Sequence, residues 1–184
     1  MEGRASPGGS PGLRDAAVLV PVFRDADGEL RVAIVVRADD GGLHGGQLGL
    51  PGGKPEPGDA DLLATALREA EEEIGLGPAD VVVLAALRPF ETRSTGWRVH
   101  PFLGRISPDT TWRLQETEVV GVLTPRVRVL ADPTSRATLP FTSIRFREPL
   151  LVDGIDVEGH VLWGMTLRLF DDVLPRLLAG EWDV

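Results

Sequence analysis

Several residue types are missing or scarce in this 184-residue chain, and each absence excludes a class of function. Cysteine is absent, which excludes disulfides, thiolate catalysis and cysteine-ligated zinc. No basic start precedes an apolar segment, and no apolar run approaches membrane-spanning length, so we expect a cytoplasmic protein that does not bind membranes. The net charge of −9 argues against a nucleic-acid partner, although an anionic small molecule remains compatible where bound cations invert the local field.

The remaining composition suits one folded domain. With 42% apolar and 26% charged residues, the chain is long enough for one hydrophobic core, and a second full domain would be cramped. Residues 1–12 are rich in glycine, proline and serine without periodicity, which predicts a flexible N-terminal tail. We therefore expect a single domain over residues 13–184.

Alternating apolar residues and turn residues indicate mainly strands. The strands are expected at Ala16–Phe23, Leu30–Arg37, Val81–Phe90, Arg98–Ile106 and Val119–Leu123, with a hairpin beginning over Ala137–Phe146. A short helix is expected at Pro125–Leu130 and an amphipathic helix at Gly164–Leu178, where Pro175 weakens the last turn. Strands with few helices, one of them between strands, predict an α/β (α+β) fold, an α/β/α sandwich around a mixed sheet.

The most informative stretch is Gly53–Leu76, which places four glutamates behind a glycine-rich turn. At about 100° of rotation per residue, Glu69, Glu72 and Glu73 share an arc beside the apolar face of a helix, whereas Glu71 points away. Close pairs of like charge on a helix repel, and a cation would reverse that effect. The plainer interpretation is an acidic, solvated helix face.

The surroundings of this helix favour a metal site over a solvated face. Pro51–Gly53 forms a tight turn whose backbone a ligand can approach closely, because glycine has no Cβ. Asp59 or Asp61 can cap the helix, and Gly75 stands where it should end. Carboxylate ligands without cysteine or clustered histidine select hard cations such as Mg²⁺ or Mn²⁺.

These residues resemble the Nudix box, Gly-x5-Glu-x7-Arg-Glu-U-x-Glu-Glu-x-Gly-U, in which U is a bulky apolar residue. Arg68–Leu76 fits its second half, with the small Ala70 as a modest departure. The segment after Gly53 is one residue longer than the standard box, and Asp59 stands for the expected first glutamate. The resemblance implies the Nudix fold and hydrolysis of a diphosphate linkage with divalent metal.

Three further stretches resemble the coenzyme A diphosphatase branch of this family. They are Ala33–Gly53 before the box, Thr95–Phe102, and Trp163–Thr166 at the start of the last helix. The first stretch departs from the branch pattern at two positions, where Gly42 replaces an expected arginine and Leu50 replaces a phenylalanine. The lost arginine matters most, because a guanidinium is a natural phosphate ligand.

The resemblance also implies roles for individual residues. The implied metal ligands are Glu69, Glu72, Glu73 and a backbone carbonyl of Gly52 or Gly53. In the catalytic set, which includes Glu72 and Glu73, Arg68 is expected to orient the carboxylates. For the general base, Glu118 is favoured over Glu116, with a box glutamate and a solvated loop as alternatives.

Four basic residues are candidate ligands of the substrate phosphates: Arg37, His44, Lys54 and Arg93. Lys54 is the single lysine and directly follows the diglycine, although an exposed turn lysine is the plainer interpretation. Trp97 can either stack on adenine or pack as a hairpin aromatic.

The leading hypothesis is a diphosphatase that cleaves coenzyme A or its thioesters to 3′,5′-ADP and 4′-phosphopantetheine. One alternative is a Nudix hydrolase of ADP-ribose or another nucleoside diphosphate derivative. Another is a catalytically silent Nudix-fold binding module, which the complete set of box glutamates disfavours. Nudix domains often dimerise, so a homodimer is an open alternative.

Overall fold

A computed structural model describes residues 13–39, 45–92, 96–142 and 147–184, and within these ranges the strands form three sheets. The strands are β1 (Arg14–Arg24), β2 (Leu30–Val32), β3 (Ile34–Arg37), β4 (Leu48–Gly49), β5 (Gly52–Gly53), β6 (Val82–Ala86), β7 (Phe90–Glu91), β8 (Trp97–Arg105), β9 (Val119–Leu123), β10 (Arg136–Phe141), β11 (Leu150–Val157) and β12 (His160–Trp163). The helices are α1 (Leu62–Ile74), α2 (Val127–Ala131) and α3 (Gly164–Leu178), with short 3-10 turns at Pro78–Asp80 and Pro133–Ser135.

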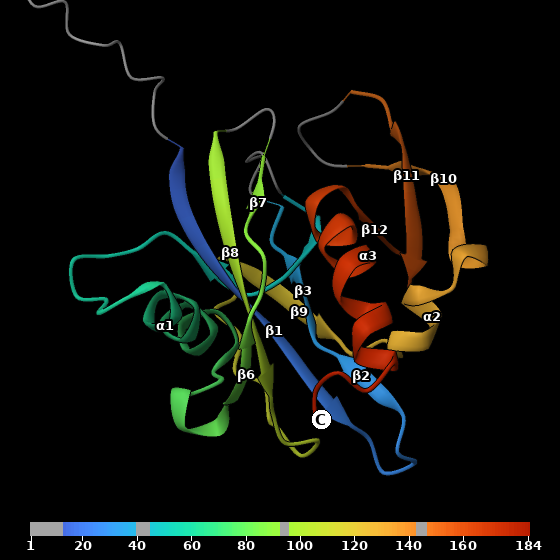
Figure 1. The fold of residues 1–184 in the computed structure, drawn as a ribbon. Coiled ribbons are helices and arrows are strands. Elements are labelled where there is room, and N and C mark those ends of the chain that lie inside the picture. Colours follow the sequence, from blue (N-terminus) through green and yellow to red (C-terminus); the bar gives the residue numbers. More distant parts are fainter. Residues whose placement is uncertain (1–12, 40–44, 93–95, 143–146) are drawn as a thin grey trace, which may run out of the picture.

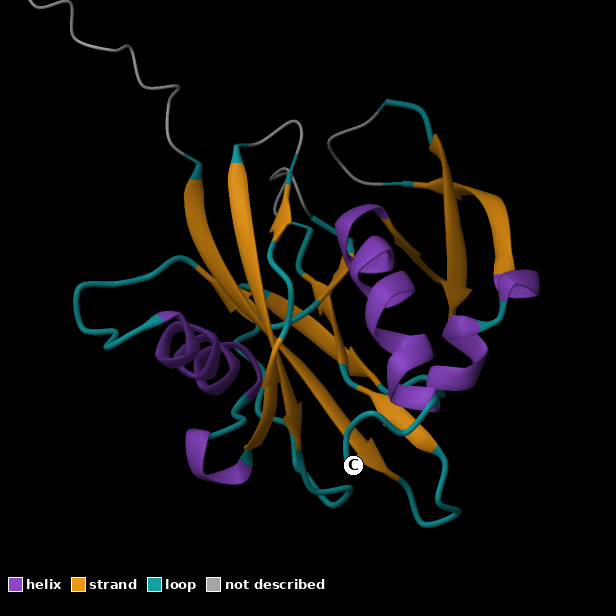
Figure 2. Ribbon diagram, viewed as in Figure 1, coloured by secondary structure: helices purple, strands orange, loops and turns teal. Residues whose placement is uncertain are grey.

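The largest sheet has the order β2-β1-β8-β6, with β5 paired to β1 and β7 to β8. The β1–β8 pairing is parallel and its neighbours are antiparallel, so the sheet is mixed. Two smaller sheets follow the orders β4-β3-β9 and β10-β11-β12. The largest sheet lies between α1 on one side and α3 with α2 on the other, and β10 and β11 lie beyond α3 (Figures 1 and 2). This arrangement confirms the predicted α/β/α sandwich.

Alternate residues of β1 belong to two different cores. Ala17 and Leu19 pack in the cluster that contains the apolar face of α1. Val18 and Val20 point the other way, into the cluster that contains the apolar face of α3. This follows from the period of two along a strand, and burying each valine or leucine side chain stabilises the fold by about 1.5–3 kcal/mol.

The helix of the acidic stretch begins and ends where its capping residues predict. The Asp61 carboxylate accepts a hydrogen bond from Ala64 N–H at 2.8 Å, which satisfies a free donor of the first turn. Gly75 adopts the left-handed conformation, with φ of 71°, and its N–H returns to the helix carbonyls. Of the two predicted caps, Asp61 caps the helix, and Asp59 instead binds Arg68.

Two predicted strands are interrupted in the structure. The strand expected over Leu30–Arg37 divides into β2 and β3, which join different sheets, and Ala33 N–H at the break donates to the Pro21 carbonyl at 2.9 Å. The strand expected over Val81–Phe90 divides into β6 and β7. Apolar residues run without interruption through the first break, so the sequence pattern does not reveal it. At the second break stand Arg88 and Pro89, and proline is a signal against a continuous strand that the expected range passed over.

The other elements agree closely with expectation. The helix α3 covers Gly164–Leu178 and continues through Pro175 to its end. The strand β10 covers the first half of the predicted hairpin start, Ala137–Phe141, and residues 143–146 lie outside the described residues. Among the described residues, no helix is long and apolar enough to cross a membrane.

Candidate active site

The glycine turn brings backbone directly against the acidic helix. Gly52 and Gly53 form β5, which pairs with Val18 and Ala17 of β1 beside α1. A Cβ on Gly53 would lie 2.3 Å from the Glu69 carboxylate, and one on Gly52 would lie 2.3 Å from the Ala17 carbonyl. These positions therefore require glycine for close approach, as the sequence predicts.

Glu73 is the most unusual side chain of the site, because it is a carboxylate with 2% exposure. Its Oε2 accepts a hydrogen bond from Gly52 N–H at 3.3 Å, and its Oε1 lies 3.9 Å from Arg37 Nη2. Burial raises the pKa of Glu73 to about 7, although Arg37 and the Gly52 N–H act in the opposite direction. Its negative charge is therefore only partly compensated by the protein.

Glu69 has the same character in a milder form. Burial raises the pKa of its carboxyl, which the Arg68 guanidinium partly offsets. The negative charge of Glu118 raises the pKa of both Glu69 and Glu73, so three acids influence one another. This mutual repulsion is the electrostatic condition that a bound cation would relieve.

Glu72 differs from the other two predicted metal ligands. Its carboxylate is 58% exposed and accepts a hydrogen bond from Arg68 Nη1 at 2.7 Å. In the described parts of the chain, no three acidic or histidine side chains already stand in a metal-binding arrangement. The three carboxylates thus share one side of α1, as predicted, without being closed around a common point.

Arg68 links the carboxylates to the loop before the helix. Its guanidinium contacts Glu69 at 3.1 Å as well as Glu72, and Nη2 donates to the Lys54 carbonyl at 3.0 Å. Asp59 holds it from the loop, with bonds of 2.9 Å to Nε and 3.1 Å to Nη2. The guanidinium therefore depresses the pKa of Asp59 well below its usual range.

Sequence reasoning placed Asp59 only as a substitute for the box glutamate or as a cap, and its role as the anchor of Arg68 was missed. The available signal was its position six residues after Gly53, where the family pattern expects an acid.

The chain that leads to Glu118 is attached to the end of α1 by its backbone. Arg113 N–H donates to the Ile74 carbonyl and Gln115 N–H to the Glu73 carbonyl, both at 3.0 Å. Glu118 follows in a turn closed by its own N–H on the Gln115 carbonyl at 2.8 Å. Glu118 is therefore close enough for its charge to raise the pKa of Glu69 and Glu73. Glu116 is not among the charged groups that shift these two pKa values.

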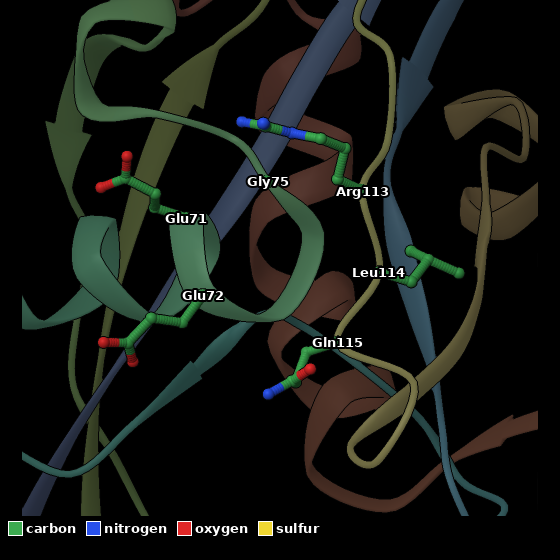
Figure 3. Close-up of a pocket in the computed structure, with 6 residues that line it drawn as sticks. All are labelled: Glu71, Glu72, Gly75, Arg113, Leu114 and Gln115. Atoms are coloured by element: carbon green, nitrogen blue, oxygen red, sulfur yellow. The ribbon is translucent and has the colours of Figure 1, made fainter.

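An open pocket lies between the end of α1 and this attached chain (Figure 3). It is lined by Glu71, Glu72, Gly75, Arg113, Leu114 and Gln115. Glu71, which the helix geometry turned away from the other acids, is exposed here. Figure 3 shows the carboxylates of Glu71 and Glu72 directed away from the attached chain.

The structure describes two of the four predicted phosphate ligands. Arg37 lies at the site, beside Glu73. Lys54 follows β5, and its ammonium lies over the ring of Trp97, 5.6 Å from the ring centre. His44 and Arg93, and also Gly42, lie outside the described residues.

The comparison with protein families agrees with this fold and site. The NUDIX domain matches residues 13–140, more than half of the chain. This chain therefore belongs to the Nudix family. The match confirms the resemblance seen in the sequence, although it does not distinguish the coenzyme A branch.

Individual relatives support the same assignment. Nudix hydrolase 22 of Arabidopsis thaliana, which is named chloroplastic, is 36% identical over 162 residues, covering 85% of this chain and 53% of that protein. The uncharacterized Nudix hydrolase NudL of Salmonella paratyphi B is 42% identical over 109 residues, covering 59% and 55%. The chain thus spans about half the length of the curated relatives it matches.

A solved structure supports the fold. The NUDIX domain of Shewanella oneidensis NrtR, crystallised with ADP ribose, superposes with a TM-score of 0.59 at 18% identity and covers 94% of each chain. At this identity, the likeness establishes the shared fold alone.

Proposed function

We propose that this chain is a Mg²⁺- or Mn²⁺-dependent diphosphatase. The observation that carries the proposal is the buried, undercompensated carboxylate of Glu73 beside Glu69, facing the glycine backbone. These donors are all oxygens, which fits a hard divalent cation. The residues that would hold it are Glu69, Glu72, Glu73 and the carbonyl of Gly53.

The remaining residues divide the chemistry among them. A bound divalent ion supplies neutralisation of charge at the phosphoryl oxygens and a polarised water. Glu118 is the proposed base that accepts the proton of the attacking water. Arg68, held by Asp59, is a positioning residue that aims Glu69 and Glu72.

For the substrate, we propose coenzyme A or its thioesters, cleaved to 3′,5′-ADP and 4′-phosphopantetheine. The support is the likeness of Ala33–Gly53, Thr95–Phe102 and Trp163–Thr166 to the coenzyme A branch. Arg37, His44, Lys54 and Arg93 are the proposed phosphate ligands. The proposed unit is a single domain over 13–184, acting in the cytoplasm on a small molecule.

A second candidate is hydrolysis of ADP-ribose. It is favoured by the fold shared with the Shewanella NUDIX domain, which was crystallised with ADP ribose. A silent binding module is a third candidate, and the repelling acids of α1 disfavour it because a module without metal has no need of them.

One experiment separates these candidates. The protein and a Glu73→Gln control are incubated with Mg²⁺ and a panel of diphosphates, and the products are identified by mass. We expect 3′,5′-ADP from coenzyme A with the wild type and at least a hundredfold slower release with the variant, the order of loss when a group that stabilises transition-state charge is removed. AMP from ADP-ribose with coenzyme A untouched would reject the coenzyme A assignment, and binding without turnover would indicate the silent module.

A further inference from the structure

The N-terminal ends of β1 and β8 lie side by side (Figure 1) and carry charged and aromatic residues instead of apolar ones. Arg14 pairs with Trp97 in register, and the Arg14 Cζ lies 4.1 Å from the centre of the Trp97 ring. The next residues of the two strands, Asp15 and Arg98, point to the opposite face because side chains alternate along a strand. This end of the sheet therefore has two chemically different faces.

Two acids of the described residues near this end, Asp15 and Glu91, are engaged on the opposite face. Asp15 contacts His100 at 2.9 Å, and Glu91 forms an ion pair with Arg98 at 3.0 Å. On the face that carries Trp97, the described side chains place two cations at one aromatic ring, Arg14 and Lys54, in a chain with a net charge of −9.

Lys54 is the second of these cations, and it adjoins the proposed metal site. Its carbonyl is fixed by Arg68 Nη2 at 3.0 Å, while its ammonium lies 5.6 Å from the centre of the Trp97 ring. The preceding residue, Gly53, lies so close to Glu69 that an added Cβ would be 2.3 Å from the carboxylate. Because Gly53 and Lys54 are consecutive residues, the acids of α1 and the cations around Trp97 are separated by a single peptide unit of the chain.

Trp97 itself is held in place by its backbone. Its N–H donates to Thr92 Oγ1 at 2.9 Å, and its carbonyl accepts from Thr92 N–H at 2.8 Å. Arg14 N–H donates to the neighbouring Gly96 carbonyl at 3.0 Å. The backbone positions that carry Trp97 and Arg14 are therefore fixed before any ligand arrives, which lowers the entropic cost of binding.

We propose that Arg14, Lys54 and Trp97 form a subsite for a phosphate monoester of the substrate, separate from the diphosphate that is hydrolysed. Two cations match a phosphate monoester, which carries a charge near −2 at neutral pH, better than a single carboxylate. The placement of the hydrolysed diphosphate at Glu69 and Glu73 rests on the proposed function. The subsite would make the enzyme selective for nucleotides that carry an additional phosphate.

The test uses 3′,5′-ADP and AMP, which differ by one phosphate monoester and contain no diphosphate bond to hydrolyse. Binding of each to the full chain with Mg²⁺ is measured by calorimetry. The wild type should bind 3′,5′-ADP more tightly than AMP. Lys54→Gln and Arg14→Gln should each weaken 3′,5′-ADP binding by about tenfold, the usual loss for one charge-assisted contact, and change AMP binding less than about twofold.

Arg98→Gln is the matched control, because it removes the same charge from the other face of β8. It should leave the preference for 3′,5′-ADP unchanged. Equal binding of both nucleotides to the wild type, or an equal loss in the Arg98 variant, would overturn the subsite. The subsite would also be overturned if inorganic phosphate competed equally strongly against AMP and 3′,5′-ADP. That result indicates a site that binds any free anion.

This measurement is independent of turnover. If coenzyme A is not hydrolysed in the product assay, the coenzyme A assignment fails, while the nucleotide pair still decides the subsite. If coenzyme A is hydrolysed but both nucleotides bind alike, the subsite fails and the proposed function stands.

Discussion

Glu73 is a carboxylate that must be charged to bind a cation, yet it is buried where charge is poorly solvated. Its burial at 2% exposure places a carboxylate where the charged form is poorly solvated, and Arg37 at 3.9 Å is too distant for a full ion pair. The pKa of about 7 is the result. Without a cation, the protein therefore loses stability to keep this carboxylate ready.

The destabilisation caused by the buried Glu73 carboxylate should be measurable as a pH dependence of the free energy of unfolding. Because the folded state binds a proton more tightly than the unfolded chain, the contribution of Glu73 is fully present below pH 4.5 and is lost as pH rises through about 7. We expect Glu73→Gln to raise the free energy of unfolding by about 3 kcal/mol at pH 8 and hardly at pH 4.5. Urea unfolding in EDTA at both pH values measures this difference.

Glu71→Gln is the control for that measurement, since it removes an exposed charge from the same helix. It should change stability by less than about 0.5 kcal/mol at either pH. A Glu73→Gln variant that is no more stable than wild type at pH 8 would contradict the role of burial.

How far the sequence could predict this site depends on the range of each interaction. The helical period predicted that Glu69 and Glu73 lie together and that Glu71 lies apart, because both depend only on residues of one helix. The same period predicted that Arg68 lies near Glu72, and the two side chains are hydrogen-bonded at 2.7 Å. The exposure of Glu72 and the anchoring of Arg68 by Asp59 were not predicted in the same way. They depend on the Asp59 loop, whose folding over the helix has no periodic signature.

The end of α1 and the chain at Arg113–Gln115 behave as one structural unit. Their backbone bonds connect the helix of the metal ligands to the segment of the proposed base. Gly75 permits this contact, because a Cβ on it would lie 2.8 Å from Arg113 Cβ. Sequence reasoning found Gly75 as a helix end, but it could not find the partner, since backbone hydrogen bonds between distant segments do not depend on side-chain type.

Gly75→Ala should therefore disturb both parts. The left-handed φ of 71° and the clash with Arg113 together should destabilise the protein by about 1–3 kcal/mol. We expect turnover to fall as well, because Glu118 moves relative to Glu69. Thermal unfolding and initial rates measured on the same sample test both effects.

Gly58→Ala is the matched variant, because nothing lies within 4 Å of the added Cβ and its φ is not positive. It should be neutral or stabilise slightly. Comparable losses in the two variants would show that the loss of any glycine near the box is sufficient, and would reject the contact with Arg113 as the cause.

In the whole domain, the acidic helix α1 and the cations around Trp97 lie on opposite sides of β1. The strand β1 contributes to both cores, and β5 beside it carries the glycines between Glu69 and Lys54. A ligand that engages both sides would tie α1 to the main sheet. Metal binding should then stabilise the entire fold and not α1 alone.

We expect Mg²⁺ at a hundred times its dissociation constant to stabilise the protein by about 2.7 kcal/mol, or roughly 5–10 °C in Tm for a domain of this size. Scanning calorimetry with and without EDTA at pH 8 measures the shift. A double Glu69→Gln, Glu73→Gln variant should show almost none. An equal shift in that variant would place the cation elsewhere.

The backbone bonds at the end of α1 also have an electrostatic consequence. The C-terminal end of a helix carries a partial negative charge from its free carbonyls, and here Glu72 and Glu73 add to it in a last turn that contains no basic residue. The N–H groups of Arg113 and Gln115 cover two of these carbonyls and so offset part of the macrodipole. The amide hydrogens of Arg113 and Gln115 should consequently exchange more slowly once a bound cation stabilises the last turn of α1.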